Sequence, residues 1–258
     1  MLAIISDIHG NYEALEAVLA EVKRRGIKEI ICLGDIIGYG ASPRECIDAV
    51  AEHCKVSLCG NHDHAVLYEP HNFNLGAEQA CYWTRAQFEQ DPDDARRARR
   101  WKFLGTLPVR YLDKNFMCVH GSPRRPVNEY LFAEDVYTNP AKLIANFDRM
   151  ERKVCFVGHT HVPGVFLDDP YFDQPDELPQ PRNYYVTDEK AIINVGSVGQ
   201  PRDRDPRASF VVVHEEERAK GMRVEFVRVE YDIDTSVKKI LAVPELDDFL
   251  GNRLYDGR

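Results

Sequence analysis

The sequence predicts an α/β fold of the α+β type, in which two β-sheets form a sandwich flanked by helices. Between residues 2 and 58, apolar runs of strand length alternate with segments of helical periodicity, which is typical of parallel βαβ units. Beyond residue 108, short apolar runs follow one another at the spacing of hairpins, which is typical of antiparallel strands. We therefore expect the first half of the chain to form a more parallel layer and the second half a more antiparallel one.

The first half of the chain carries clear start and stop signals for its elements. Strands are expected over residues 2–6, 29–33 and 55–58, and helices over 11–25, from 42 onward, and over most of 76–104. Gly26 follows the first helix, as a C-terminal cap should. Ser42 and Glu45 are expected to form a capping box around Pro43, which suits the first helical position.

The second half reads as a series of strands with few helices. Strands are expected over residues 109–112, 116–119, 153–157, 162–167, 184–186, 191–195, 209–214 and 223–229. Helices are expected over residues 140–150 and 234–241. The segment 168–183 is rich in proline and aspartate and is expected to be an irregular excursion. No repeat or clean linker interrupts the pattern, so we expect one domain over residues 1–258.

Composition narrows the class of protein. The 258 residues carry 33 Lys and Arg against 42 Asp and Glu, a net charge of −9, which disfavours a general nucleic-acid binder. The basic run over 96–100 follows three aspartates and is better explained as a solvated helix. The seven cysteines show no CxxC spacing and are expected to be reduced. With no signal peptide and no membrane span in the sequence, a cytoplasmic enzyme is expected.

Polar residues with metal-binding chemistry follow five of the predicted strands. The five motifs are Asp7-x-His9, Gly34-Asp35-x-x-Gly38, Gly60-Asn61-His62-Asp63, His120-Gly121 and Gly158-His159-x-His161. Each residue alone could be a turn, a helix cap or an ordinary histidine. Together, carboxylate, amide and imidazole groups suit a divalent metal such as Mn, Fe, Zn, Co or Ni. The carboxyl ends of sheet strands are also where open α/β folds place their sites.

The five motifs in this order resemble those of the calcineurin-like metallophosphoesterase superfamily, and the stretch 194–197 resembles a segment of its bacterial phosphodiesterase-like branch. The resemblance implies two divalent ions, with manganese most suited to activity. Asp7, His9 and His161 would bind the first ion, and Asn61, His120 and His159 the second. Asp35 would bridge both ions, which would lie roughly 3.5–4 Å apart and hold a bridging hydroxide for in-line attack on phosphorus. His62 would be the general acid or a stabiliser of the leaving oxygen.

The chain departs from the protein Ser/Thr phosphatases of this superfamily. Those enzymes carry an aspartate that orients the catalytic histidine and then an arginine that binds phosphate, and here Gly38 and Tyr39 stand in these places. Asp63, another carboxylate or a backbone carbonyl would have to orient His62 instead. Candidate substrate contacts, because they lie near the motifs or in a loop after a strand, are Tyr39, Ser122, Arg124, Arg125 and Arg202.

Three functions are compatible with these motifs. The first is a metal-dependent phosphodiesterase that acts on a small phosphoester or a nucleotide. The second is a phosphomonoesterase, which includes phosphoprotein phosphatases and dinucleoside polyphosphate hydrolases. The third is an inert scaffold, which the complete ligand set and the presence of His62 disfavour.

Overall fold

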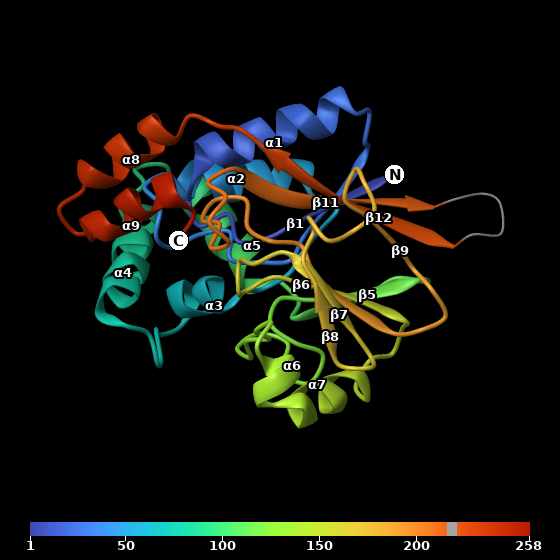
Figure 1. The fold of residues 1–258 in the computed structure, drawn as a ribbon. Coiled ribbons are helices and arrows are strands. Elements are labelled where there is room, and N and C mark those ends of the chain that lie inside the picture. The colour runs from blue at the N-terminus through green and yellow to red at the C-terminus, as the bar shows by residue number, and fades with distance from the viewer. Residues whose placement is uncertain (216–220) are drawn as a thin grey trace.

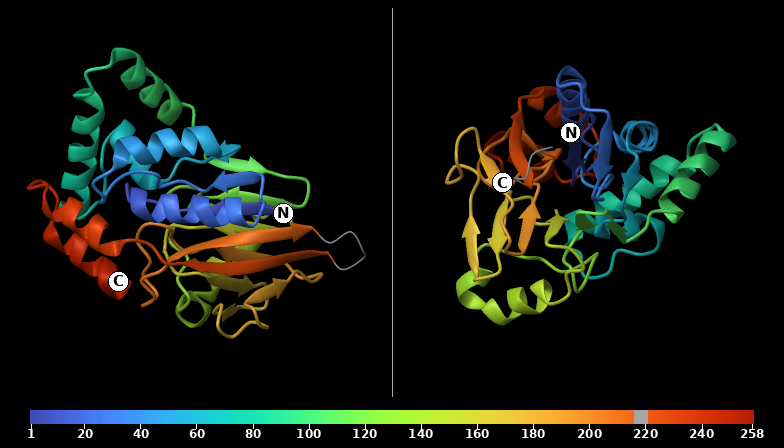
Figure 2. Two further views of the ribbon diagram at one scale, coloured as in Figure 1. Left: turned by 90° about the horizontal axis from the view of Figure 1, so that it is seen from above. Right: turned by 90° about the vertical axis from the view of Figure 1, so that its right-hand side faces the viewer.

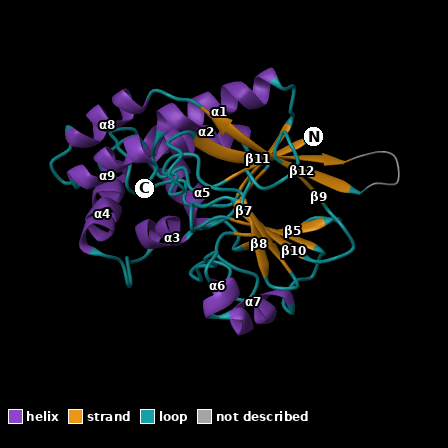
Figure 3. Ribbon diagram, viewed as in Figure 1, coloured by secondary structure: helices purple, strands orange, loops and turns teal. Residues whose placement is uncertain are grey.

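The computed structural model, which describes residues 1–215 and 221–258, has two six-stranded sheets packed face to face with helices outside them (Figure 1, Figure 3). The first sheet has the order β3 (Val56–Ser57), β2 (Glu29–Cys32), β1 (Leu2–Ile5), β11 (Ala208–Glu215), β12 (Met222–Val229) and β9 (Asn183–Tyr185). The second has the order β4 (Arg110–Leu112), β5 (Phe116–Val119), β6 (Val154–Val157), β10 (Ala191–Asn194), β7 (Gly164–Leu167) and β8 (Tyr171–Asp173). The predicted α/β sandwich is confirmed.

The expected division into a parallel and an antiparallel layer is wrong, because both sheets are mixed. In the first sheet β1, β2 and β3 are parallel, but β11 pairs antiparallel with β1 and continues into β12 and β9. In the second sheet β5, β6 and β10 are parallel, and β4, β7 and β8 are antiparallel. Strands of the second half therefore belong to both sheets. Hairpin-like spacing along the sequence does not determine which strands become neighbours, so the expected division could not be inferred from it.

Helices cover the outer face of each sheet and one end of the sandwich (Figure 1, Figure 2). On the first sheet lie α1 (Tyr12–Arg24) and α2 (Pro43–His53), and on the second lie α6 (Asp135–Thr138) and α7 (Pro140–Phe147). The elements near the end include α3 (Asn61–Leu67), α4 (Leu75–Glu89), α5 (Asp94–Gly105), α8 (Ile233–Leu241), α9 (Asp248–Asn252) and the 3₁₀ turn η1 (Arg253–Asp256).

Strand alternation divides the core into layers. In β1, Ala3 and Ile5 face the apolar cluster beneath α1 and α2, whereas Ile4 faces the cluster between the two sheets. In β6, Phe156 faces the same inter-sheet cluster and Cys155 faces the cluster beneath α7. Each fully buried Ile or Phe side chain contributes about 1.5–3 kcal/mol to the stability of the folded state. Both faces of each central strand are therefore buried, which fixes the register and the position of the loop that follows each strand.

Three local expectations are revised. Ser42 makes no capping hydrogen bond, so the predicted capping box is wrong; its hydroxyl instead accepts a hydrogen bond from Lys239 of α8 at 3.3 Å. The excursion over 168–183 contains β8, which extends the second sheet by pairing with β7. Beyond Pro244, where the sequence pattern is weak, the chain forms α9 and η1. In both of these segments, packing against neighbouring elements stabilises secondary structure that the sequence pattern does not predict.

Several predictions from composition are confirmed. All seven cysteines are free thiols, and six of them are buried. The basic run on α5 is paired with acidic residues: Arg97 contacts Asp94 at 2.7 Å, and Arg100 contacts Asp48 and Asp91 at 2.5 Å. None of the helices in the described ranges is both long enough and apolar enough to cross a membrane.

Candidate metal centre

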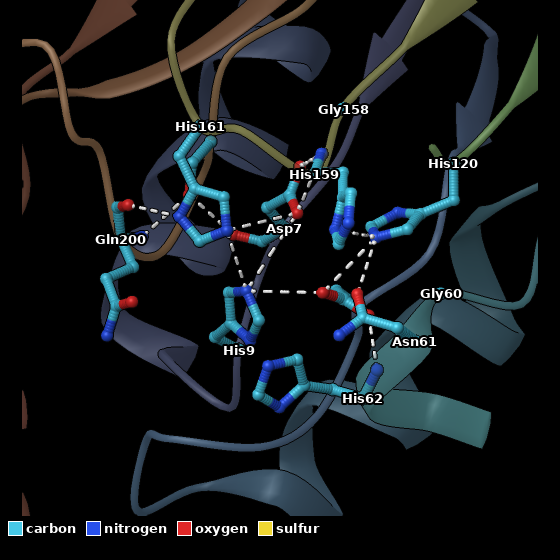
Figure 4. A network of polar contacts seen from close by, with 12 residues as sticks. Asp7, His9, Gly60, Asn61, His62, His120, Gly158, His159, His161 and Gln200 are labelled. Atoms are coloured by element: carbon cyan, nitrogen blue, oxygen red, sulfur yellow. Dashed lines mark hydrogen bonds and ion pairs between the residues drawn. The ribbon is translucent and has the colours of Figure 1, made fainter. Parts of the chain in front are cut away.

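The seven predicted ligands come together at the carboxyl ends of the parallel strands (Figure 4). Asp7 follows β1, Asp35 follows β2, Asn61 begins α3 after β3, His120 follows β5, and His159 and His161 follow β6. Their donor atoms form two groups within which every atom lies within 4.8 Å of the others: Asp7, His9, Asp35 and His161, and then Asp35, His120 and His159. The side-chain oxygen of Asn61 lies 3.1 Å from His120 Nε2 and extends the second group.

Asp35 belongs to both groups through a single oxygen. Its Oδ1 accepts a hydrogen bond from the backbone N–H of His62 at 2.8 Å. Its Oδ2 lies 3.5 Å from His9 Nε2 and 3.3 Å from His120 Nε2, between the two sets of rings. The neighbouring backbone approaches so closely that a Cβ at Gly60 would lie 2.1 Å from Oδ1. The carboxylate is therefore held in one orientation, with Oδ2 presented to both groups.

The backbone of the ligand loops adopts a conformation that is costly for these residue types. Asp7, His9, Asp35, His159 and His161 all have positive φ angles, between 51° and 69°. A non-glycine residue in this region costs on the order of 1–3 kcal/mol and persists only where its surroundings enforce it. The loops are held by bonds such as those from the N–H groups of Asp7 and Ile8 to the carbonyls of Gly34 and Asp35, at 3.0 and 2.9 Å. Such strain concentrated in one place marks a functional site.

The donor atoms are arranged as ligands of divalent cations rather than as hydrogen-bond partners of one another. His9 Nε2 lies 3.1 Å from His161 Nε2, and His120 Nε2 lies 3.2 Å from His159 Nδ1. A neutral imidazole has one donor and one acceptor, so rings that converge on each other and on carboxylates leave lone pairs that a cation would satisfy. The Nδ1–H of His161 donates to the carbonyl of Gln200 at 2.6 Å, which leaves Nε2 free to bind a metal.

Burial controls the charge of the histidines. It lowers the pKa of His159 to about 3, and with Arg202, His161 and His120 it lowers the pKa of His62 to about 4. For His120, burial also disfavours the charged form, but the nearby carboxylates, Asp35 above all, outweigh it and raise its pKa to about 9. His120 must lose a proton before it can bind a metal ion, so metal binding to this group is coupled to proton release.

The segment after β10 fixes the loops that carry the ligands. The side-chain amide of Asn194 donates to the carbonyl of Gly158 at 2.7 Å and to the hydroxyl of Thr160 at 2.8 Å. The hydroxyl of Ser197 donates to the carbonyl of Asp7 at 2.7 Å. This segment therefore connects the loop after β1, which carries Asp7 and His9, with the loop after β6, which carries His161.

Comparison with known proteins assigns the family. The model of the calcineurin-like phosphoesterase superfamily domain matches residues 1–218. The chain belongs to the calcineurin-like phosphoesterase superfamily. An uncharacterised protein of Methanocaldococcus jannaschii is 39% identical over 268 residues, in a match that covers 100% of this chain and 98% of that protein.

Solved structures agree with this assignment. A metallophosphoesterase from Sphaerobacter thermophilus is 37% identical, with a TM-score of 0.81 over 100% of this chain and 98% of that one. A hypothetical protein of Pyrococcus horikoshii is 22% identical, with a TM-score of 0.75 over 100% and 99% of the two chains, and shares the fold. As a member of this superfamily, the chain is a hydrolase that acts on phosphoric esters.

His62 of this phosphoesterase lies beside the ligand set with its ring enclosed by other rings. The centroids of Tyr39, Phe73 and His9 lie 4.3, 4.7 and 4.7 Å from that of His62. Asp63 does not contact the ring, because its oxygens accept hydrogen bonds from the backbone N–H groups of Gly60, Ile36 and Ile37. Asp63, one of the groups that the sequence offered as a partner for the His62 ring, therefore has a structural role instead.

Of the candidate substrate contacts, Tyr39 and Arg202 lie at the site. The guanidinium carbon of Arg202 lies 5.9 Å from the Tyr39 ring centroid, and its positive charge lowers the pKa values of His9 and His161, although burial is the larger cause for both. Arg202 Nη2 donates to Gln200 Oε1 at 2.9 Å, and Arg202 Nε is buried with no hydrogen-bond partner among the described residues. The proposed role of Tyr39 and Arg202 in binding substrate stays a prediction.

Ser122, Arg124 and Arg125 are not part of the ligand set. Ser122 Oγ and Arg124 Nη2 donate to the Glu129 carboxylate at 2.7 and 2.6 Å, and the backbone N–H of Arg125 donates to Ser122 Oγ at 3.2 Å. These contacts tie together the loop after β5, which carries Asn128 and Tyr130. The proposed role of the three residues in binding substrate stays a prediction.

Several residues beside the site were missed in the sequence. They are Cys81 of α4, Phe73 and Asn128 from loops, Tyr130, which stacks on His159 with ring centroids 3.7 Å apart, and Arg253 of η1. Burial and the nearby Arg202 lower the pKa of Arg253 to about 10. None of these residues lies in a recognisable motif, and each reaches the site through tertiary packing.

Proposed function

We propose that this phosphoesterase hydrolyses phosphodiesters of small molecules, including nucleotides, with two divalent ions bound by the seven ligands. Manganese is the ion expected to give activity, and Fe, Zn, Ni or Co also suit the donor set. Asp7, His9 and His161 would hold one ion, Asn61, His120 and His159 the other, and Asp35 both. When bound, the ions would supply an activated hydroxide and neutralise charge on the phosphoryl group.

The observation that carries this proposal is the junction at Asp35, where one carboxylate oxygen faces both groups of imidazoles. A single-ion site would need no shared ligand. The residue at the edge of this junction is His62, which is the one side chain of the Gly60–Asp63 motif left without a ligand or capping role. We infer that His62 donates a hydrogen bond to the leaving oxygen as the bond to phosphorus breaks.

The pocket next to the ligand set supports an organic leaving group. It has a volume of about 280 Å³, close to the lower end of the range of ~300–1,000 Å³ for small-molecule sites. Its walls include Asn61, His62 and His159 together with aromatic rings and carboxamides: Tyr39, Phe73, Tyr130, Asn72, Asn74 and Asn128. No Asp, Glu, Lys or Arg is among the described residues that line it. Flat rings and amides suit a neutral aromatic group such as a nucleobase.

The charges near the site favour a diester over a monoester. A monoester keeps two negative charges on its phosphoryl group, whereas a diester has one. Tyr39 stands where the protein phosphatases have their phosphate-binding arginine, and a phenol carries no positive charge; burial raises its pKa and so keeps it neutral. Arg202 supplies a cation from a different loop. The phosphomonoesterase alternative would need Arg202, or its neighbour Arg253, to replace what the missing motif arginine provides.

Turnover of paired chromogenic substrates tests the proposal. The purified protein would be stripped of metal, reconstituted with manganese, and assayed with bis-p-nitrophenyl phosphate and p-nitrophenyl phosphate. We expect kcat/KM to be higher for the diester. The reverse ranking would assign a monoesterase, and no stoichiometric metal with no turnover of either ester would exclude the proposed chemistry.

A further inference from the structure

The orientation of His62 depends on what meets its Nδ1 atom. Cys81 Sγ, on α4, lies 3.7 Å from this nitrogen, and both side chains are buried. Gly38 also lies close to this nitrogen, because an added Cβ would come within 2.6 Å of Nδ1. Gly38 also has a φ angle of 90°, which disfavours any other residue. No side chain at position 38 could therefore stand beside this ring, and a thiol occupies the place of a hydrogen-bond partner.

The other neighbours of His62 fix where the ring lies but not which nitrogen carries the proton. Tyr39, Phe73 and His9 contact it through their rings. Asp35 accepts a hydrogen bond from the backbone N–H of His62, and the Asp63 carboxylate is occupied by backbone N–H groups. Within the described residues, Cys81 is the only hydrogen-bond partner of the imidazole ring. The tautomer of His62 therefore depends on this contact.

The second nitrogen of His62 is the one that substrate can reach. Nε2 makes no hydrogen bond with the described residues and is not among their fully buried unpaired atoms, and His62 lines the pocket beside the ligand set. To donate a hydrogen bond to a leaving oxygen in that pocket, Nε2 must carry the ring proton. Nδ1 is then the acceptor of the neutral ring, and a donor opposite it stabilises this tautomer.

We propose that Cys81 is a positioning residue whose S–H group donates to His62 Nδ1 and so keeps the ring proton on Nε2. This inference rests on the proposed function of His62. Burial raises the pKa of the Cys81 thiol, so the sulfur keeps its proton and can donate it. The aspartate that orients the corresponding histidine in the protein phosphatases can only accept a hydrogen bond from the ring, so the polarity of the hydrogen bond is reversed here. A thiol is a weak donor, so its contribution should be modest.

A leaving-group series separates this role from simple packing. Cys81→Ala, Cys81→Ser and the control Cys46→Ala would be assayed as manganese-loaded enzymes with methyl p-nitrophenyl phosphate and methyl phenyl phosphate. Cys46 is a buried helical cysteine of α2 whose thiol makes no hydrogen bond to the described residues, so its side chain matches that of Cys81 in all but its partner. Phenoxide is the poorer leaving group and depends more on a donated hydrogen bond.

For Cys81→Ala we expect kcat with the phenyl ester to fall about 5–10-fold, the effect of one neutral hydrogen bond, and less than about threefold with the p-nitrophenyl ester. KM and metal content should not change. Cys81→Ser should recover most of the loss, and Cys46→Ala should show none. An equal loss with both esters, or no recovery with serine, would overturn the proposal. If the unaltered enzyme cleaves neither diester, the proposed function fails instead.

A spectroscopic measurement needs no variant. In the zinc-loaded protein, ¹⁵N chemical shifts of the His62 ring report which nitrogen is protonated. We expect the proton on Nε2 with Nδ1 as a hydrogen-bonded acceptor. A proton on Nδ1 would show that the ring donates to the sulfur and would refute the proposed role of Cys81.

Discussion

The metal-ligand set and the wall of the pocket beside it are built in opposite ways. The ligands lie at strand ends and are almost completely buried, and five of the seven are held in strained backbone conformations by the loops around them. The pocket wall comes from loops and helices over residues 71–77 and 128–130, and its side chains are largely half-buried or exposed. Both regions contact His62, which lies at the boundary between them.

This difference separates the chemistry from the choice of substrate. Ligands at the ends of buried strands inherit the rigidity of the sheets, so a reaction that needs several donors at fixed positions can be built there. A wall made of loops can change shape and residue type without disturbing the sheets. We therefore expect substitutions in the ligand set to abolish metal binding, and substitutions in the wall to change substrate affinity with the metals in place.

The largest effect is expected for Asp35→Asn. An amide oxygen is a neutral and weaker ligand, and the substitution would remove the one charge that both ligand groups share. We expect loss of at least one ion and a fall in kcat of about 10³-fold or more. Metal content by elemental analysis, together with diester turnover, measures both. A protein that keeps two ions and full activity would contradict the shared role of Asp35.

A smaller loss is expected for His62→Ala, because this residue lies outside the ligand groups. Removing the donor to the leaving oxygen should lower kcat by about 10²-fold, the lower end of what general acid catalysis contributes. Both ions should remain, since no ligand atom is lost. Elemental analysis again provides the control, and loss of a metal from this variant would show that His62 belongs to the ligand set.

The sequence predicted the ligand set more fully than its surroundings, and the reason is local. Each ligand motif is a short run directly after a buried strand, so the sheet brings the motifs together. Asp7 and His159 are 152 residues apart, yet the backbone N–H of His159 donates to the Asp7 carboxylate at 3.0 Å. Strand periodicity was enough to place both residues at the same edge of the sandwich.

What the sequence did not predict depends on long-range packing. Cys81 is one of six buried cysteines, and nothing in the pattern around it distinguishes it from Cys46. Tyr130 stacks on His159 from a loop with no strand or helix signal. The same limit applies to the sheets, because the pairing of β11 with β1 joins residues more than 200 positions apart. Spacing along the chain carries no information on such neighbours.

Asn128→Ala should affect the wall alone. The Asn128 side chain lines the pocket and makes no hydrogen bond with the residues described in the structure. For nucleotide diesters we expect KM to rise about 3–10-fold, the value of one lost hydrogen bond, with kcat and metal content unchanged. Asn252→Ala, an exposed change on α9, is the control. A KM that stays constant with every nucleotide diester would exclude Asn128 from substrate binding.

The smallest effect is expected for Glu129→Gln, which tests how the wall is attached. Although burial opposes ionisation, Arg124, Ser122 and Asn146 outweigh it and lower the pKa of Glu129 to about 2. The folded state therefore favours the carboxylate. Its stabilising contribution is complete above the unfolded pKa of 4.5 and is lost as the pH falls from there toward 2.

Urea unfolding of the protein and of Glu129→Gln, measured from pH 7 down to pH 3, follows this contribution. At pH 7 we expect the variant to be less stable by about 1–2 kcal/mol, since the hydrogen bonds from three residues to a partly exposed carboxylate are weakened. The difference should shrink below pH 4.5, where protonation begins to weaken the same contacts in the unaltered protein. A difference that stays constant down to pH 3 would assign the loss to packing. The loop after β5 would then be held by its shape, and the charge of Glu129 would not be what keeps Tyr130 against His159.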